Sequence, residues 1–144
     1  MNLFGMLEMS GSALGAERMR AEIVTANMAN AQVTHTEEGG PYRRKMVVFA
    51  ERRVPHFSLA LAGAAGTAAE GVRVTQIVTS NAAPLQRYEP GHPDADARGF
   101  VAYPNIDPME EMTDLLGASR AYELNASAIQ TAKAMIQQSL DLLR

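Results

Sequence analysis

The fold is decided by residues 107–143, which read DPMEEMTDLLGASRAYELNASAIQTAKAMIQQSLDLL. Asp107 is suited to cap a helix because its carboxylate can accept hydrogen bonds from the free N–H groups of the first turn, and Pro108 fits the first helical position. No further proline follows before Leu143, and Gly117 is the only glycine. The stretch therefore predicts one helix of about 35 residues, or about 50 Å at 1.5 Å per residue.

Apolar and small side chains cover most of the circumference of this predicted helix. One line follows alternating steps of three and four residues, with Lys133 as its one misplaced member. It contains Met112, Leu115, Ser119, Tyr122, Ala126, Ile129, Ile136, Leu140 and Leu143. A second line beside it contains Gly117, Ala121, Leu124, Ala128, Ala132, Met135 and Leu142. The narrow polar face is left to Arg120, Glu123, Ser127, Gln130, Gln138 and Asp141. Such a helix needs a partner helix within the chain and further contacts with other molecules.

The N-terminal stretch, from Leu3 to about Ala31, predicts a second long helix. It carries two apolar lines, one of Leu7, Leu14, Ala21, Val24 and Met28, the other of Met6, Met9, Ala13, Ala16 and Ile23. The segments Ser10–Ala13 and Gly15–Ala16 are small enough for another backbone to approach, and tight helix packing should offset the ~1 kcal/mol that each glycine costs a helix. Asn27 and Asn30 bracket the expected helix end, because Asn tolerates turn conformations.

The middle of the chain predicts a small β region. A strand or hairpin arm should begin near Tyr42 and end at Pro55, a second strand should cover Gly71–Val78, and Phe100–Tyr103 should form a short third strand. The segment Leu59–Glu70 is rich in alanine and glycine, which indicates a mobile loop. The expected fold is α+β, with long N- and C-terminal helices packed as a coiled-coil-like pair. Its three parts are a helix within 1–33, a β and extended domain over 34–106, and a helix within 107–144.

Composition limits the possible functions. The chain has 144 residues and a net charge of −3, which argues against general affinity for nucleic acid or anionic membranes. It has no cysteine, which excludes disulfides, thiolate metal sites and a cysteine nucleophile. The first residues lack the basic and apolar regions of a signal peptide, and no apolar run is long enough to span a bilayer, so we expect neither a cleavable secretion signal nor an anchor.

One loop could carry chemistry. His92, Asp94 and Asp96 offer an imidazole and two carboxylates that could bind a divalent metal or serve as an acid/base site, so a small metal-binding module or enzyme is the alternative function. The structural interpretation is favoured, with Pro and Gly setting turns and the Asp side chains capping backbone N–H groups.

A basic run, Arg43–Lys45, could touch phosphates. With no basic surplus over the chain, a charged strand edge that meets acidic neighbours such as Glu37, Glu38 or another subunit is favoured.

Six segments resemble the flagellar basal-body rod family, and the third and fourth are most like a proximal-rod member. They are Ser10–Leu14 (SGSAL), Ala26–Ala31 (ANMANA), Glu37–Lys45 (EEGGPYRRK), Tyr88–Asp96 (YEPGHPDAD), Gly99–Asn105 (GFVAYPN) and Arg120–Asn125 (RAYELN). The resemblance implies a structural subunit with no enzymatic activity, no cofactor, no small-molecule substrate and no nucleic-acid partner. Its terminal helices would pack around a hollow axis and assemble helically into the proximal rod, which transmits torque from motor to hook.

The same resemblance implies partners and a location. The partners would be other copies of the chain, other proximal-rod proteins, the rod-base protein, the distal rod and the flagellar type III export apparatus. The rod would cross the periplasm, and the subunit would be exported without a cleaved signal. Combining the apolar lines with this role predicts subunit-interface residues Leu7, Leu14, Ile23, Asn27, Asn30, Met112, Leu116, Tyr122, Leu124, Asn125, Ile129, Met135, Ile136 and Leu140.

Overall fold

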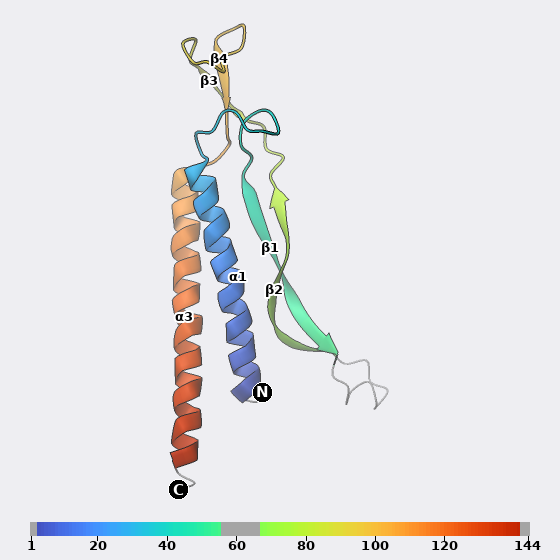
Figure 1. Cartoon of the computed structure of the whole chain (residues 1–144), viewed down its shortest axis with the longest axis vertical. Coiled ribbons are helices and arrows are strands. Elements are labelled where there is room, and N and C mark those ends of the chain that lie inside the picture. Colours follow the sequence, from blue (N-terminus) through green and yellow to red (C-terminus); the bar gives the residue numbers. More distant parts are fainter. Residues whose placement is uncertain (1–2, 56–66, 142–144) are drawn as a thin grey trace. The chain divides into compact units, whose positions relative to one another are not determined.

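The structure is a computed structural model that describes residues 3–55 and 67–141. In chain order, its elements are α1 (Leu3–Ala29), β1 (Lys45–Pro55), β2 (Thr67–Thr79), β3 (Leu85–Tyr88), β4 (Phe100–Tyr103) and α3 (Pro108–Asp141) (Figure 1). The expected α+β class, with a long helix near each end, is confirmed. The chain divides into two compact units, which are described separately below. The first unit draws on Met1–Met19, Val48–Gln76 and Ala118–Arg144, and the second on Arg20–Val47 and Ile77–Gly117.

Both helices begin and end close to their predicted limits. At the start of α3, the Asp107 carboxylate accepts a hydrogen bond from the Met109 N–H at 2.9 Å, and the Asp107 carbonyl accepts one from the Glu111 N–H at 3.1 Å. The predicted cap is therefore confirmed. At the end of α1, both the backbone N–H and the side-chain Nδ2 of Asn30 donate to the Ala26 carbonyl. The first is the regular helical bond between residues four apart, and the side-chain amide adds a second donor to the same carbonyl.

In the first unit, small side chains allow close packing. Ser10, Ala16, Ala118 and Ala132 are buried. The backbone of β2 approaches α1 so closely that a Cβ on Gly71 would lie 2.1 Å from the Ser12 hydroxyl oxygen. That hydroxyl accepts a hydrogen bond from the Val72 N–H at 3.0 Å and donates one to the Met9 carbonyl. The small residues of α1 thus admit another backbone as predicted, but it belongs to a strand and not to a helix.

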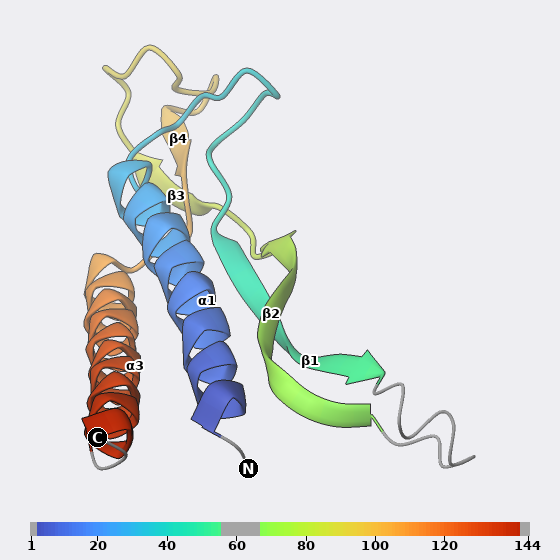
Figure 2. The same ribbon diagram turned by 60° about the horizontal axis from the view of Figure 1, so that its bottom comes forward.

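In the second unit, β3 and β4 form an antiparallel pair with Leu85 opposite Tyr103 and Tyr88 opposite Phe100. Val101 is fully buried, whereas all four residues of β3 are exposed. The Tyr88 and Phe100 rings meet edge to face with centroids 5.4 Å apart. Figure 2 shows the connection from α1 to β1 running beside the loop that joins β3 to β4, and the Thr34 hydroxyl donates to the Asp94 carboxylate there.

The β region differs from the prediction in three places. Strand β2 begins at Thr67, so the predicted loop Leu59–Glu70 is wrong for its last four residues, and residues 59–66 lie outside the described residues. The backbone groups of Thr67–Glu70 form hydrogen bonds with β1, and this pairing does not depend on the side chains of these residues. Strand β1 begins at Lys45, three residues later than expected, and ends at Pro55 as predicted. Strand β3 was not predicted, since its sequence LQRY has no β-branched residue.

Candidate assembly surface

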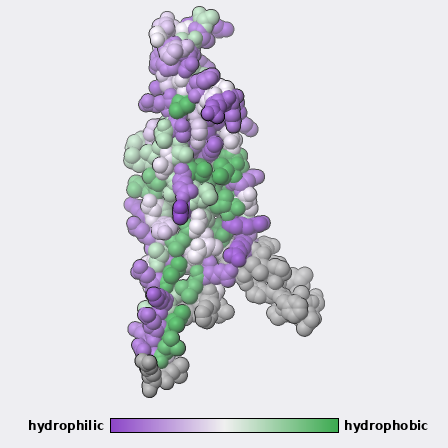
Figure 3. All heavy atoms as spheres, in the orientation of Figure 1, coloured by the Kyte–Doolittle hydropathy of each residue, from purple (hydrophilic) through white to green (hydrophobic). Residues whose placement is uncertain are grey.

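Helix α3 exposes large apolar side chains and buries small ones. Leu124 is 72% exposed, Leu140 60% and Leu116 55%. Ala118 and Ala132, by contrast, are almost completely buried. Figure 3 shows hydrophobic residues along one side of the C-terminal part of α3 and hydrophilic residues along the other. The large apolar groups of α3 are therefore free to contact another molecule.

The predicted interface residues differ in how far they are accessible. The exposed ones are Met112, Leu116, Tyr122, Leu124, Met135 and Leu140. Those that are partly buried are Leu7, Leu14, Ile23, Asn30, Asn125, Ile129 and Ile136. The side-chain amide of Asn30, the residue after α1, donates to the Ala26 carbonyl, and that of Asn125 donates to the Ala121 carbonyl within α3. Asn27 is only 1% exposed, and its side chain makes four hydrogen bonds to other parts of the same chain. The structure thus separates an outward group on α3 from residues that contribute to packing within the chain.

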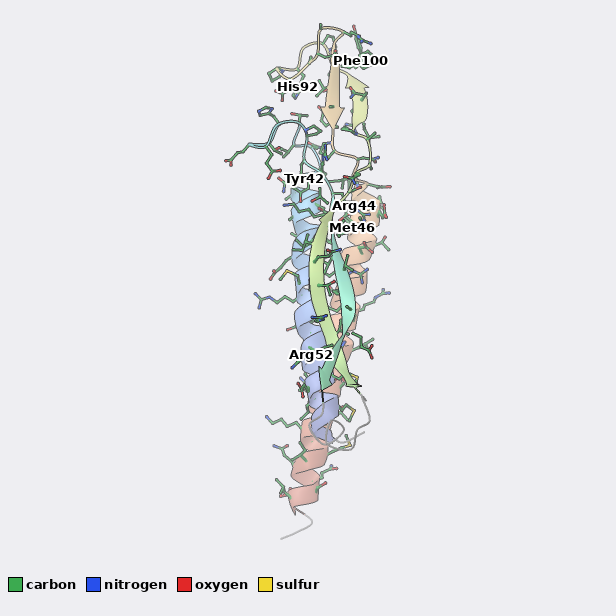
Figure 4. All side chains as sticks on the ribbon, turned by 90° about the vertical axis from the view of Figure 1, so that its right-hand side faces the viewer. Tyr42, Arg44, Met46, Arg52, His92 and Phe100 are labelled. Carbon is green, nitrogen blue, oxygen red and sulfur yellow. The ribbon has the colours of Figure 1, made fainter. Side chains whose placement is uncertain are left out.

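Asn27 belongs to a polar cluster in the second unit, which we call the Asn27 cluster: the buried Asn27 and Glu111, the partly buried Tyr42 and Arg44, and the backbone of Lys45. The Asn27 Nδ2 donates to the Lys45 carbonyl at 2.8 Å and to the Glu111 Oε2 at 3.0 Å. Its Oδ1 accepts from the Lys45 N–H at 2.9 Å and from the Tyr42 hydroxyl at 3.2 Å. The Glu111 side chain is fully buried, and its Oε1 accepts from the Arg44 Nε. Figure 4 shows Tyr42 and Arg44 beside the end of α1 and the start of α3.

Arg44 lies among three carboxylates of α3. Besides Glu111, its guanidinium is 3.5 Å from Glu110 and 3.6 Å from Asp114. Burial acts to lower the pKa of Arg44, but the hydrogen bond and charge of Glu111, with the charges of Glu110 and Asp114, outweigh it and raise the pKa. The expectation that the basic run meets Glu37 or Glu38 is corrected for Arg44, since its acidic neighbours come from the first two turns of α3.

The environment of Tyr42 is shaped by the same carboxylate. Burial raises the pKa of its phenol above the usual value, and the charge of Glu111 raises it further. A neutral phenol can donate to Asn27, whereas a phenolate cannot. The raised pKa therefore extends the pH range over which the phenol stays a hydrogen-bond donor.

Sequence reasoning missed this cluster by assigning Asn27 to a helix end. One signal was available: Asn27 follows the buried Val24 by three residues, and Glu111 precedes the buried Ala118 by seven. Both spacings place a polar side chain on the buried side of its helix. A polar residue at such a position needs a partner, which periodicity alone does not identify.

The loop of His92, Asp94 and Asp96 is held together by its own hydrogen bonds. The Asp96 Oδ1 accepts from the N–H groups of Arg98 at 2.8 Å and Phe100 at 2.9 Å. Asp94 receives the Thr34 hydroxyl, and the His92 Nδ1 accepts from the Asp94 N–H at 3.1 Å. The predicted capping of backbone N–H groups is confirmed for Asp96. Across residues 3–55 and 67–141, no three His, Cys, Asp or Glu side chains are grouped to hold a metal ion.

The described part of the chain also has no helix that is long and apolar enough to cross a membrane.

Comparison with known proteins finds similarity over the whole chain. Residues 97–142 match the family described as flagellar basal body rod FlgEFG protein C-terminal. The flagellar basal-body rod protein FlgC of Borreliella burgdorferi is 35% identical over 154 residues, covering 100% of this chain and 99% of that protein. The FlgC proteins of Escherichia coli O6:H1 and Bacillus subtilis are 37% and 36% identical. Each alignment covers 99% of this chain, with 98% of the E. coli protein and 99% of the B. subtilis protein.

Proposed function

Because this chain belongs to the FlgC family of flagellar basal-body rod proteins, we propose that it joins a helical proximal rod through the outward apolar side chains of α3. The chain is a structural subunit of the flagellar basal body, it works with other flagellar components, and it is not an enzyme. The rod relatives give no support to the alternative of a metal-binding module or enzyme.

The observation that carries the proposal is the exposure of Leu116, Leu124 and Leu140 along one helix. Fully burying one leucine side chain stabilises an association by roughly 1.5–3 kcal/mol. At about 100° per residue, Leu116 and Leu124 lie about 80° apart around α3 and can enter one contact, whereas Leu140 lies about 160° from Leu124 and would face a different neighbour. A contact repeated between successive subunits in a head-to-tail manner produces a filament and not a closed dimer.

The partners follow from the proposed position in the rod. They are other copies of this chain, the other proximal-rod proteins, the rod-base protein and the distal rod, with the flagellar type III export apparatus acting before assembly. In this proposal the rod crosses the periplasm, and its shared apolar packing makes it stiff enough to transmit torque to the hook. The resemblance of the terminal segments to other rod proteins supports these assignments.

The test replaces Leu124 by aspartate in the full chain, with Ser127→Asp as the matched control. Ser127 lies three residues farther along α3 and is also exposed, but it belongs to the polar face. Both variants should fold and keep the wild-type stability, because neither position is buried. Leu124→Asp should abolish rod assembly and swimming, since it places a charge in an apolar contact, whereas Ser127→Asp should assemble. Normal rods from folded Leu124→Asp would rule the proposal out.

A further inference from the structure

The apolar lines of α1 and α3 do not by themselves define how the two helices align. Lines with heptad-like spacing remain apolar when one helix slides along the other by a turn, about 5.4 Å. In the second unit the buried apolar side chain of α1 is Val24, which a neighbouring turn could also accommodate. Something more specific must select one alignment.

The Asn27 cluster contains that specificity. Asn27 uses both hydrogens of its amide and accepts two bonds at its oxygen, so its hydrogen-bonding capacity is filled. Both carboxylate oxygens of Glu111 are occupied, one by Asn27 and one by Arg44. A slip of one turn would separate Asn27 from Glu111 and leave a buried carboxylate with part of its donors removed. Such a state is strongly disfavoured, whereas the same slip costs an apolar contact little.

Asn27 also aligns a third segment with the two helices. Its amide pairs with both the N–H and the C=O of Lys45, the first residue of β1, much as a neighbouring strand would. Two turns farther towards the N-terminus of α1, Arg20 forms an ion pair with Asp114 at 3.1 Å. This pair is more exposed than the Asn27 cluster and contributes less to alignment.

From this geometry we infer that Asn27, Glu111 and Arg44 are positioning residues that select the register of α1 against α3 and fix the start of β1. The consequence of this inference for assembly rests on the proposed function. The register determines which outward side chains of α1 and α3 lie at the same level along the helices, and therefore which of them a neighbouring subunit contacts together. The Asn27 cluster would then set the geometry of assembly without touching the neighbour.

Stability alone cannot separate this role from an ordinary stabilising one, because a buried ion pair replaced by apolar side chains is often neutral in stability. The decisive quantity is the alignment of the helices. Since the chain has no cysteine, two introduced cysteines can carry the only spin labels. Thr25→Cys on α1 and Thr113→Cys on α3 suit this purpose. Both positions are exposed, and each hydroxyl bonds only to a carbonyl four residues earlier in its own helix.

The experiment measures the distance between the two labels by pulsed electron paramagnetic resonance in the purified full chain. The parent protein should give one narrow distance. The variant Asn27→Leu/Arg44→Met/Glu111→Leu should keep its helical circular dichroism but give a broader distance distribution or a second distance, because the two helices then populate more than one alignment. The matched control is Asn30→Leu, which removes an amide that donates to the Ala26 carbonyl of α1, and it should keep the single distance.

A single narrow distance in the triple variant, equal to that of the parent, would overturn the inference. If the triple variant does not fold, the same distance measured in the single variant Asn27→Ala tests the inference instead. It retains the ion pair of Arg44 and Glu111, and an unchanged narrow distance there would overturn the inference equally. These outcomes are independent of rod assembly, so they can be distinguished from a failure of the proposed function in the Leu124→Asp test.

Discussion

The Asn27 Nδ2 lies 3.0 Å from the Glu111 Oε2, which joins residues 84 positions apart in the sequence inside the second unit. Both side chains are almost completely inaccessible to solvent, and each partner supplies what the other lacks. The amide is neutral, so Glu111 keeps one cationic partner, Arg44, within hydrogen-bonding distance. A charged side chain at position 27 should consequently destabilise the fold more than a change in the size of that side chain.

Asn27→Asp should destabilise the chain by about 3–5 kcal/mol, since it removes the donor to the Lys45 carbonyl and places a second carboxylate against Glu111. Urea denaturation followed by circular dichroism measures the change. Gln32→Glu is the matched control because it makes the same chemical change at an exposed position, and it should stay within about 0.5 kcal/mol of wild type. Equal losses in the two variants would contradict the importance of the buried position.

Alkaline pH should weaken the fold through Tyr42. The pKa of Tyr42 is raised in the folded state, first by burial and then by Glu111, so the unfolded chain loses this proton more readily. The contribution is therefore fully present below about pH 10, the pKa of an unperturbed tyrosine, and is lost as pH rises above it. Denaturation series between about pH 8 and about pH 11 should show a steeper fall for wild type than for Tyr42→Phe. Parallel curves would refute the role of Tyr42.

Gly71→Ala should cost about 2 kcal/mol or more, because the φ angle of Gly71 is +137°, which L side chains rarely adopt, and the added Cβ would collide with Ser12. Adding Ser12→Ala should recover only part of the loss, because the backbone strain remains. Gly91→Ala serves as the control, since the φ of Gly91 is not positive and a Cβ added there would meet no atom within 4 Å beyond its chain neighbours. Thermal unfolding compares the three variants, and an unchanged melting temperature for Gly71→Ala would contradict the close approach.

Asp96→Ala should destabilise the loop between β3 and β4 by about 1 kcal/mol, because two backbone N–H groups lose their acceptor. Asp96→Asn retains an oxygen at the same place and should lose less.

Titration with Mg²⁺ or Zn²⁺ should leave the melting temperature of the wild-type chain unchanged. A saturable rise that disappears in His92→Ala would instead favour a metal site.

Local signals in the sequence were sufficient for the helices. Asp107 followed by Pro108 placed the start of α3, and the absence of proline up to Leu143 gave its length. The residues predicted for the narrow polar face of α3 are all exposed, as expected. Each of these features depends on neighbours within a few residues, so no knowledge of tertiary structure was needed.

What escaped prediction depends on contacts between distant segments. Strand β3 has no β-branched residue and becomes a strand because β4 pairs with it. Thr67–Glu70 join β2 through pairing with β1 for the same reason. Asn27 and Glu111 each look unfavourable when buried alone, and only their partnership explains them. The fourteen predicted interface positions stay predictions until a neighbouring subunit is observed.

The hydrogen bonds from α1 to the strands also have a protective effect. A two-stranded sheet has unpaired backbone groups along both outer edges, which another chain could extend by adding a strand. In the first unit Ser12 occupies the N–H of Val72, and in the second Asn27 occupies both polar groups of Lys45. Short polar side chains of a helix thus take the place of a missing strand at these two positions. A protein that must polymerise through its helices thereby has fewer opportunities to aggregate through its sheet.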